Sequence, residues 1–372
     1  MVQPDSMGER MIYIGAGNIY SPLGKSLSEN WENLLAGKTA IRPYSSLKPE
    51  DPPLYLSRFE EKGNFYTRIF DCIDTTLLSL VGQEPDWSKT VLIFSSTKAD
   101  IEQLESRNIE QSLLDYTCTK LQEKYPAKTA ITVSNACISG ITALLLAHDL
   151  IKTGQYENAL VVAADNCSTF VSEGFKSFYA IASDFCKPYD TNRQGINLGE
   201  GVASAFVSSD RNIFTNTPTA LLGGASANDA NHISGPSRTG EGLFRATKRA
   251  LEYAGKSPEQ IDYISAHGTA TRYNDDMESM AIDRLNLNEV PVNSLKGYFG
   301  HTLGAAGLIE TLVTIEQMNT NLILGTKGLE NPGTVKPINV FPDTIEKHLN
   351  TVLKSGSGFG GCNAAIVLEK LK

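Results

Sequence analysis

Long apolar runs are missing from this sequence, and so are the features of a secretion signal. No stretch approaches the ~20 consecutive apolar residues that a membrane-spanning helix needs. The opening residues, MVQPDSMGERMIYIG, do not combine a charged segment with an apolar one as a signal peptide does. We therefore expect a soluble, cytoplasmic protein with no membrane partner.

Basic residues and paired cysteines are scarce as well. The 372 residues include 33 Lys and Arg against 42 Asp and Glu, which gives a formal net charge of −9. Nucleic acids and anionic membranes require a dominant basic surface, so we expect neither as a main partner. The six cysteines form no C-x-x-C pair and no Cys/His cluster at metal spacing, so we expect a reducing compartment and no metal site.

What the sequence does contain is a regular alternation of strand and helix patterns. Strands are predicted, for example, over 91–95, 160–165, 261–266 and 352–356, and helical patterns lie between such strands. This alternation is typical of mainly parallel sheets that are covered by helices.

The order of the predicted elements is similar in two parts of the chain, residues 11–214 and 215–372. We interpret this similarity as an internal duplication, without a flexible linker and preceded by a disordered lead at residues 1–10. The remaining expectations are a loop over 36–65, an irregular excursion over 166–195 and an outer strand over 202–208.

Cys137 lies between a short strand pattern at 131–133 and a helical pattern that begins near residue 141. The unpaired N–H groups and the dipole at a helix N-terminus favour the thiolate form of a cysteine. A cysteine on such a turn can therefore be a nucleophile. A small apolar residue that fills the turn fits this stretch alone equally well.

Two of the five histidines stand beside glycine near the end of a strand or the start of a helix. His267 lies in SAHGTATRYND and His301 lies in KGYFGHTLGAAG. Ligands of α/β folds bind beyond the carboxyl ends of the strands, so both histidines are candidates for a site. The other three lack such a setting, and His148 on a helix face is expected to be structural.

A lysine and a glutamate accompany His301. Lys296 precedes it by five residues, and Glu310 follows Lys296 by fourteen. A lysine among apolar residues and glycine is usually a solvated surface charge. The alternative is a buried ion pair between Lys296 and Glu310, which would mark a functional site.

The glycine-rich stretch SGSGFGGCN at 355–363 lies between two predicted strands. Turns of this kind offer backbone N–H groups to a phosphate or an oxyanion. The stretch lacks the lysine and serine of a nucleotide-binding P-loop, so we do not expect a P-loop here, and a tight hairpin with structural glycines is the alternative.

Taken in order, these motifs resemble those of the β-ketoacyl-acyl carrier protein synthases, condensing enzymes of the thiolase superfamily. The resemblance is carried by GAGNIYSPLG with NWENLLAGKTAI, NACISG, KPYDTNRQGINLGEG, AHGTATRYND, GHTLGAAG and GFGGCNAA, and it extends over almost the whole chain. It points to the elongating class with a Cys-His-His site. It implies a thiolase-like α/β fold, a duplicated βαβαβαββ unit in five layers αβαβα, that forms a dimer.

The resemblance also implies roles for the central residues. Cys137 would accept the acyl group, and its N–H and that of Phe359 would form the oxyanion hole. Phe359 would also gate the site. His267 and His301 would donate hydrogen bonds to the enolate that forms when a malonyl-type extender loses CO2.

Further residues match supporting positions of the family. Lys296 paired with Glu310 would hold the tautomers of the two histidines. Thr269 and Thr271 match positions that bind the pantetheine arm, and Asp275 matches a structural acidic position.

The implied partner is an acyl carrier protein, whose phosphopantetheine carries the substrates, and the enzyme would need no cofactor of its own. The dimer would be a homodimer or a heterodimer with another ketosynthase-like subunit, in fatty acid, polyketide or polyene biosynthesis. Residues considered for carrier docking are Arg58, Lys62, Arg68 and Arg272.

Two alternatives remain. One is a non-condensing partner subunit like a chain-length factor, although such partners usually lack the cysteine. The other is a thiolase or an acyl-CoA-primed synthase, which would use a second catalytic cysteine or a Cys-His-Asn site.

Overall fold

The first half of the chain forms a five-stranded sheet. The computed structural model describes residues 10–46, 52–61, 64–229 and 235–371. The strands of this sheet are β1 (Tyr13–Tyr20), β4 (Thr90–Ser95), β5 (Thr129–Val133), β6 (Asn158–Asp165) and β8 (Gly201–Ser208). They lie in the order β1-β8-β6-β4-β5. β4 is parallel to β5 and β6, whereas β8 is antiparallel to both of its neighbours.

The second half repeats this arrangement. Its strands are β9 (Thr219–Asn228), β10 (Tyr263–Ser265), β11 (Val292–Asn293), β14 (Thr351–Gly358) and β15 (Cys362–Lys370), in the order β9-β15-β14-β10-β11. Each strand has the place and direction of its counterpart, and β15, like β8, is the antiparallel insertion. The shared topology confirms the predicted duplication.

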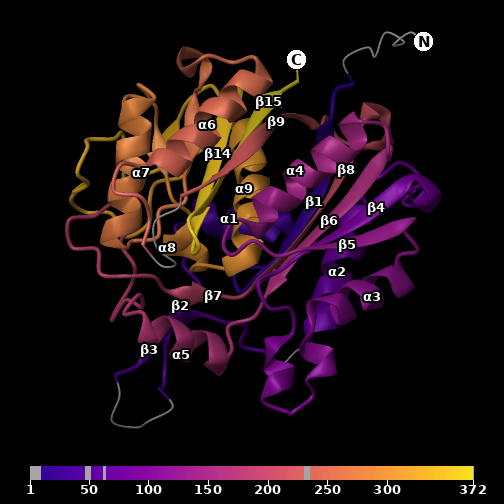
Figure 1. The fold of residues 1–372 in the computed structure, drawn as a ribbon, viewed down its shortest axis with the longest axis horizontal. Helices are drawn as coiled ribbons and strands as arrows, with labels where there is room; N and C mark the ends of the chain where they lie inside the picture. Colours follow the sequence, from indigo (N-terminus) through magenta and orange to yellow (C-terminus); the bar gives the residue numbers. More distant parts are fainter. Residues whose placement is uncertain (1–9, 47–51, 62–63, 230–234, 372) are drawn as a thin grey trace.

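The helices form three layers around these sheets (Figure 1). The outer face of the first sheet is covered by α2 (Phe65–Leu77) and α3 (Leu114–Lys124), whose apolar residues pack on β4, β6 and β8. α6 (Glu241–Ala254) and α7 (Arg272–Arg284) cover the second sheet in the same way. α4 (Ser139–Lys152) and α9 (Ala306–Thr320) share the large core between the sheets. The five layers of the thiolase-like fold are therefore present.

The two central helices cross in direct backbone contact. A Cβ atom on Gly140 of α4 would lie 2.6 Å from the backbone N of Leu308. A Cβ atom on Gly307 of α9 would lie 2.7 Å from the backbone N of Ile141. Because no side chain fits at the crossing, these glycines set how closely the halves approach. Within the described ranges, the sheets themselves pair through two residue pairs of β1 and β9.

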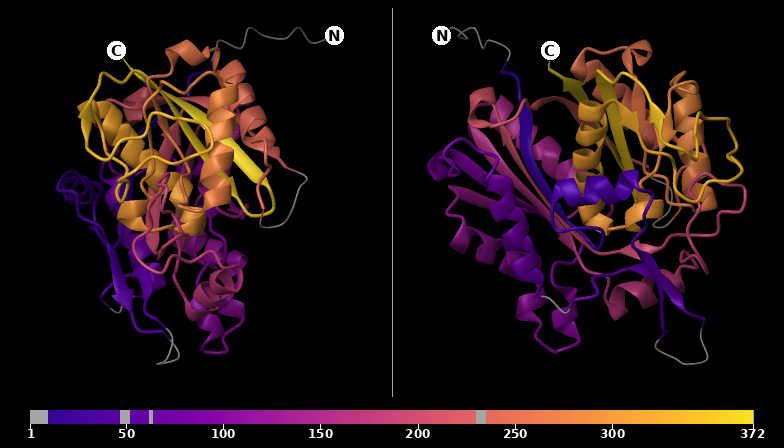
Figure 2. Two further views of the ribbon diagram at one scale, coloured as in Figure 1. Left: turned by 90° about the vertical axis from the view of Figure 1, so that its left-hand side faces the viewer. Right: turned by 180° about the vertical axis from the view of Figure 1, so that it is seen from behind.

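Smaller elements complete the molecule (Figure 2). Helix α1 (Leu27–Leu35) begins after Ser26, whose side chain accepts a hydrogen bond from the N–H of Glu29. The others are β2 (Ile41–Tyr44), β3 (Leu54–Ser57), α5 (Thr169–Ser177), β7 (Leu198–Gly199), α8 (Lys296–Phe299), β12 (Leu322–Ile323) and β13 (Ile345–Glu346).

Three local expectations are wrong. The supposed loop over 36–65 contains the hairpin β2–β3, which also pairs with β7. The supposed irregular excursion contains α5, which begins after the capping residue Ser168. β8 is not an outer strand: it lies between β1 and β6, and all eight of its residues are buried.

The predicted boundary between residues 214 and 215 falls in the connection from β8 to β9 and remains a prediction. Of the predicted lead at residues 1–10, only Arg10 belongs to the described residues. In the described ranges, no helix is both long and apolar enough to cross a membrane.

Candidate active site

Cys137 lies on a tight turn between β5 and α4, two residues before the helix begins. Ala136 has a φ angle of +45°, an unfavourable conformation for a residue with a side chain. Ser139 stabilises the turn: its hydroxyl accepts from the N–H of Asn135 at 2.7 Å and donates to the carbonyl of Ala136 at 2.6 Å. The predicted strand-to-helix turn is therefore present.

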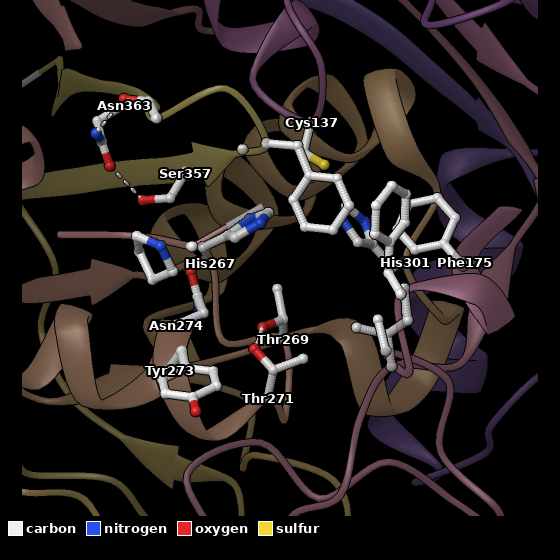
Figure 3. Close-up of a pocket in the computed structure, with 18 of the residues that line it drawn as sticks. Cys137, Phe175, His267, Thr269, Thr271, Tyr273, Asn274, His301, Ser357 and Asn363 are labelled. Atoms are coloured by element: carbon white, nitrogen blue, oxygen red, sulfur yellow. Dashed lines mark hydrogen bonds between the residues drawn. The ribbon is translucent and has the colours of Figure 1, made fainter. Parts of the chain in front are cut away.

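Two histidines from the second half face this cysteine (Figure 3). His267 follows β10, and His301 follows α8 beyond β11. The Cys137 sulfur and a nitrogen of each ring all lie within 4.8 Å of one another. The two rings are nearly perpendicular, with centroids 5.2 Å apart. The cysteine and the two histidines singled out by the sequence thus form one cluster, drawn from the carboxyl ends of strands in both sheets.

The tautomer of His267 is set by Lys296. The buried Nζ of Lys296 lies 2.7 Å from Oε1 of Glu310, 2.6 Å from the carbonyl oxygen of His267 and 3.1 Å from Nδ1 of His267. An ammonium group has three hydrogens and no lone pair, so each of these atoms accepts one hydrogen bond. Nδ1 is therefore unprotonated, and the ring carries its proton on Nε2.

His301 is oriented by a different group. Its Nδ1 accepts a hydrogen bond from the backbone N–H of Leu303 at 3.3 Å, which also leaves the proton on Nε2. Lys296 with Glu310 was expected to hold both tautomers, but its contacts reach only His267. Burial, with the nearby charge of Lys296, holds the pKa of both histidines well below the usual value. Both rings are neutral Nε2–H donors.

The thiol of Cys137 is not activated in the resting protein. Burial raises its pKa to about 11, although Lys296, Lys98 and the N–H of Phe359 act in the opposite direction. The expectation that the turn favours the thiolate is therefore wrong for the free protein. The physical reason is desolvation, which outweighs these favourable interactions.

The glycine-rich turn between β14 and β15 lies against the cysteine. A Cβ atom on Gly358 would be 3.0 Å from the backbone N of Cys137, and the N–H of Phe359 donates to the Cys137 sulfur. The N–H groups of Cys137 and Phe359 are thus brought close together. The ring of Phe359 stacks on Phe175 at 5.5 Å and meets Phe178 edge-on at 5.6 Å.

The threonines predicted to bind pantetheine lie side by side, with their hydroxyl oxygens 2.9 Å apart (Figure 3). Asp275 accepts from the N–H of Thr269 at 3.0 Å, in keeping with a structural role, and burial beside Glu278 raises its pKa to about 7. Glu278, which the sequence analysis missed, accepts from the N–H groups of both His267 and Gly268 at 2.7 Å. The two carboxyl groups of α7 therefore position the backbone that carries His267.

Two other functional residues were missed. Asp165 at the end of β6 accepts from the N–H groups of Thr97 at 3.0 Å and Gly304 at 2.7 Å, which joins loops from both halves behind the site. Lys354 of β14 is fully buried, and its Nζ lies 2.7 Å from Oε2 of Glu310. The sequence signal for Lys354 is a lysine within the strand TVLKSGSG.

Cavities open on both sides of Cys137. One, of about 360 Å³, contains the two histidines and the polar residues Thr269, Thr271, Tyr273 and Asn274. The other, of about 650 Å³, is apolar. Its phenylalanines are Phe170, Phe175, Phe178 and Phe359, with Lys98 also in its wall. Cys137, Phe175, Phe178 and Phe359 line both, so the cysteine lies where the two cavities meet.

The docking candidates have different surroundings. The side chain of Arg58 is 37% exposed and lies 3.2 Å from the buried carboxylate of Glu200. Arg68 covers the ring of Phe59 at 3.9 Å. Arg272 is exposed at the start of α7, next to Thr271, whereas Lys62 lies outside the described residues.

A thiolase-like fold with a cysteine facing two neutral histidines defines a condensing enzyme. Comparison with known proteins identifies the family. The family model "Beta-ketoacyl synthase, C-terminal domain" matches residues 219–330, and "3-Oxoacyl-[acyl-carrier-protein (ACP)] synthase III" matches residues 131–216. The chain belongs to the β-ketoacyl-acyl carrier protein synthase family.

Individual relatives extend this result. A putative mitochondrial 3-oxoacyl-[acyl-carrier-protein] synthase of Schizosaccharomyces pombe is 27% identical over 97% of this chain and 99% of its own length. The tetracenomycin polyketide synthase ketoacyl synthase alpha subunit of Streptomyces glaucescens is 31% identical over 70% of this chain and 66% of its own.

Solved structures show the same fold. A ketosynthase in complex with its chain length factor from Xenorhabdus doucetiae superposes with a TM-score of 0.88, at 24% identity and full coverage of both chains. A structure of a type II polyketide synthase acyl-carrier protein with its ketosynthase gives a TM-score of 0.91, at 23% identity, covering 98% of this chain and 100% of that one.

Proposed function

We propose that this chain is a β-ketoacyl-acyl carrier protein synthase that extends an acyl chain by decarboxylative Claisen condensation with a malonyl carrier. The observation that carries the proposal is the pair of neutral histidines, His267 and His301, each with a ring nitrogen within 4.8 Å of the sulfur of Cys137. Two hydrogen-bond donors at one point suit an enolate oxygen.

The first half-reaction transfers the acyl group. The acyl thioester enters with its carbonyl oxygen between the N–H groups of Cys137 and Phe359. The Cys137 sulfur forms a bond to the carbonyl carbon, and the bond to the carrier's sulfur breaks. The proton of the Cys137 thiol leaves with the departing pantetheine sulfur. Because the resting thiol is protonated, it loses this proton only as the thioester is attacked.

The second half-reaction forms the carbon–carbon bond. The malonyl thioester loses CO2, and the electron pair of the broken bond forms an enolate whose oxygen accepts from His267 and His301. The enolate carbon then attacks the acyl carbon on Cys137, and the thiolate of Cys137 leaves and takes a proton from solvent. Donors that are already oriented stabilise the developing charge without reorganisation, a contribution of a few kcal/mol.

We further propose an acyl carrier protein as the partner. Its phosphopantetheine arm would reach Cys137 past Thr269 and Thr271, which line the cavity that contains the two histidines. No cofactor beyond that arm is needed, because each step above uses only side chains, backbone N–H groups and the substrates. The cytoplasmic location remains a prediction, since the name of one similar protein places it in mitochondria.

Assembly into a homodimer, or a heterodimer with another ketosynthase-like subunit, is also proposed. β5 ends the sheet order of the described residues, and Leu113, which directly precedes the helix α3 that packs on β5, is 53% exposed. An open strand edge beside exposed apolar residues favours association. The molecular mass in solution, measured alone and with a candidate subunit, distinguishes the two forms from a 40.4 kDa monomer.

The alternatives have less support. A non-condensing partner has no use for Cys137, His267 and His301 in one cluster. A thiolase requires a second catalytic cysteine. The nearest candidate, Cys362, directs its sulfur to the carbonyl oxygen of Phe359 at 3.4 Å and is not among the described residues that line the two cavities.

Separate measurement of the two half-reactions tests the proposal. Incubation with an acyl carrier is expected to add the acyl mass to Cys137, and C137A is expected to remain unmodified. H301A is expected to keep most of the acylation and to lose condensation at least ~100-fold, because it lacks one enolate donor. An acylated C137A, or product formation by H301A at the normal rate, would contradict these roles.

A further inference from the structure

Glu310 lies between two buried lysines rather than beside one. Its Oε1 is 2.7 Å from Nζ of Lys296, and its Oε2 is 2.7 Å from Nζ of Lys354. The side chains are 2% exposed for Lys296, 0% for Lys354 and 5% for Glu310. Only Lys296 touches His267, so Lys354 has no direct role in the half-reactions described above.

The surroundings of Lys354 identify its charge state. Besides Oε2 of Glu310, its Nζ faces the carbonyl oxygens of Ser355 at 2.6 Å, Ser265 at 3.3 Å and Ala266 at 3.5 Å. All four are acceptors, which is more than the two hydrogens of a neutral amine can satisfy and fits the three hydrogens of an ammonium group, one of them shared. Lys296 binds the other oxygen of the same carboxylate and the carbonyl oxygen of His267. One carboxylate therefore serves two ammonium groups.

Sharing the carboxylate affects the field at His267. If Glu310 paired with Lys296 alone, the two charges would largely cancel at the imidazole. Because Lys354 engages the second oxygen of Glu310, Lys296 keeps more of its positive field toward Nδ1 of His267. A nearby positive charge disfavours protonation of an imidazole. A protonated Nδ1 could not accept from Lys296, and the ring would lose its orientation.

We propose that Lys354 is a positioning residue for the condensation step. By binding one oxygen of Glu310, it keeps Lys296 cationic toward His267 and so maintains His267 as the neutral Nε2–H tautomer. This inference rests on the proposed function. The low pKa of His267, to which burial, Lys296, His301 and Lys354 contribute, is in accord with it.

Other groups near His267 do not replace this interaction. Glu278 of α7 binds the backbone N–H of His267, and Cys137 and His301 face the ring without a formal charge in the resting protein. The titratable and charged groups around His267, from every element packed against it, are Cys137, Glu278, Lys296, His301, Glu310 and Lys354.

The test compares the pH profiles of wild type and K354M, with acylation and condensation measured separately between pH 6 and 8.5. In K354M, Glu310 neutralises Lys296, so the pKa of His267 rises and the acid limb of condensation moves up by about one pH unit or more. We expect condensation by K354M to be about tenfold weaker at pH 6 than at pH 8, while wild type changes little and acylation is retained.

A second variant separates charge from packing. In E310Q/K354M, Lys296 again lacks an anionic partner, so its field at His267 returns, and the acid limb is expected to move back toward that of wild type. A purely structural role for Lys354 predicts the opposite, because the double variant removes more native contacts. If K354M does not fold, K354Q, which can still donate to the carbonyl oxygens, is expected to show the same shift.

Controls separate this inference from the proposed function. K256M removes a lysine that pairs with Glu369 at the far end of β15 and is expected to leave the pH profile unchanged. A wild-type protein that does not condense contradicts the proposed function. With an active wild type, two results overturn the role of Lys354 and leave the proposed function standing. One is a folded K354M whose pH profile of condensation is unshifted. The other is a loss of condensation that is equal at every pH and persists in E310Q/K354M.

Discussion

At the scale of single residues, the reactivity of Cys137 depends on charges around a buried thiol. Its pKa is about 11 because desolvation outweighs the effects of Lys296, Lys98 and the N–H of Phe359. Lys98 differs from Lys296 in its position. It lines the apolar cavity, where its Nζ donates to the hydroxyl of Thr97 at 3.1 Å. Removal of the Lys98 charge therefore changes the pKa of the Cys137 thiol without disturbing the contacts of His267.

We expect K98M to raise the pKa of Cys137 further and to slow its alkylation. The thiolate is the reactive species, and each added pKa unit lowers its fraction tenfold at pH values below the pKa. Because Lys98 is only partly buried, we expect a loss of about threefold or more in the rate with iodoacetamide at pH 8.5, followed by peptide mass spectrometry. K98R retains the charge and is the matched control. Equal rates for K98M, K98R and wild type would contradict this effect.

The principal site residues could be predicted from sequence, but part of their environment could not. Cys137, His267 and His301 stand in local motifs that carry their chemistry. Lys354 stands in a strand where a lysine usually points to solvent, and its burial depends on Glu310, 44 positions earlier in the chain. The resting charge of Cys137 was also mispredicted, because desolvation is set by packing and not by the local turn.

At the scale of elements, the crossing of α4 and α9 holds the two halves together. The helix that follows the nucleophile meets the helix that carries Glu310, and Gly140 allows their backbones to touch. The position of Cys137 relative to His301 thus depends on how closely these helices approach.

We expect G140A to destabilise the protein by about 1–3 kcal/mol, as is typical of overpacked cores. The added Cβ would lie 2.6 Å from the backbone N of Leu308 and 3.1 Å from the carbonyl oxygen of Gly304, neither of which can move alone. Urea unfolding measures the change. G174A in α5 is the control, because its Cβ meets nothing within 4 Å, and it is expected to be neutral or slightly stabilising. An unchanged free energy of unfolding in G140A would show that the two helices can move apart without destabilising the protein.

Elements were predictable where their pattern is local and long. The strands and helices of both halves follow from hydrophobic periodicity, as with β4, predicted over residues 91–95 and found over 90–95. The hairpin β2–β3 was missed because its strands have four residues each and include a proline. The interior place of β8 could not be inferred from its own residues, because sheet order is decided by pairing between distant segments.

At the scale of the whole molecule, the site exists only because the duplicated halves face each other. Cys137 comes from the first half, while His267, His301 and the turn with Phe359 come from the second. Strands β5 and β11 hold equivalent places in their sheets, so the segments that follow them bring the nucleophile and His301 to one point. The duplication was visible in the order of elements, whereas the distances across the central layer required the structure.

The most direct measurement of the central claim follows the carbon atoms of the extender. The protein is given an unlabelled acyl carrier and a malonyl carrier whose three malonyl carbons are ¹³C. We expect a β-ketoacyl carrier that keeps two of the labelled carbons, release of the third as labelled CO2, and no product with C137A. A product that retains all three labelled carbons, labelled CO2 without chain extension, or equal product from C137A would contradict decarboxylative condensation at Cys137.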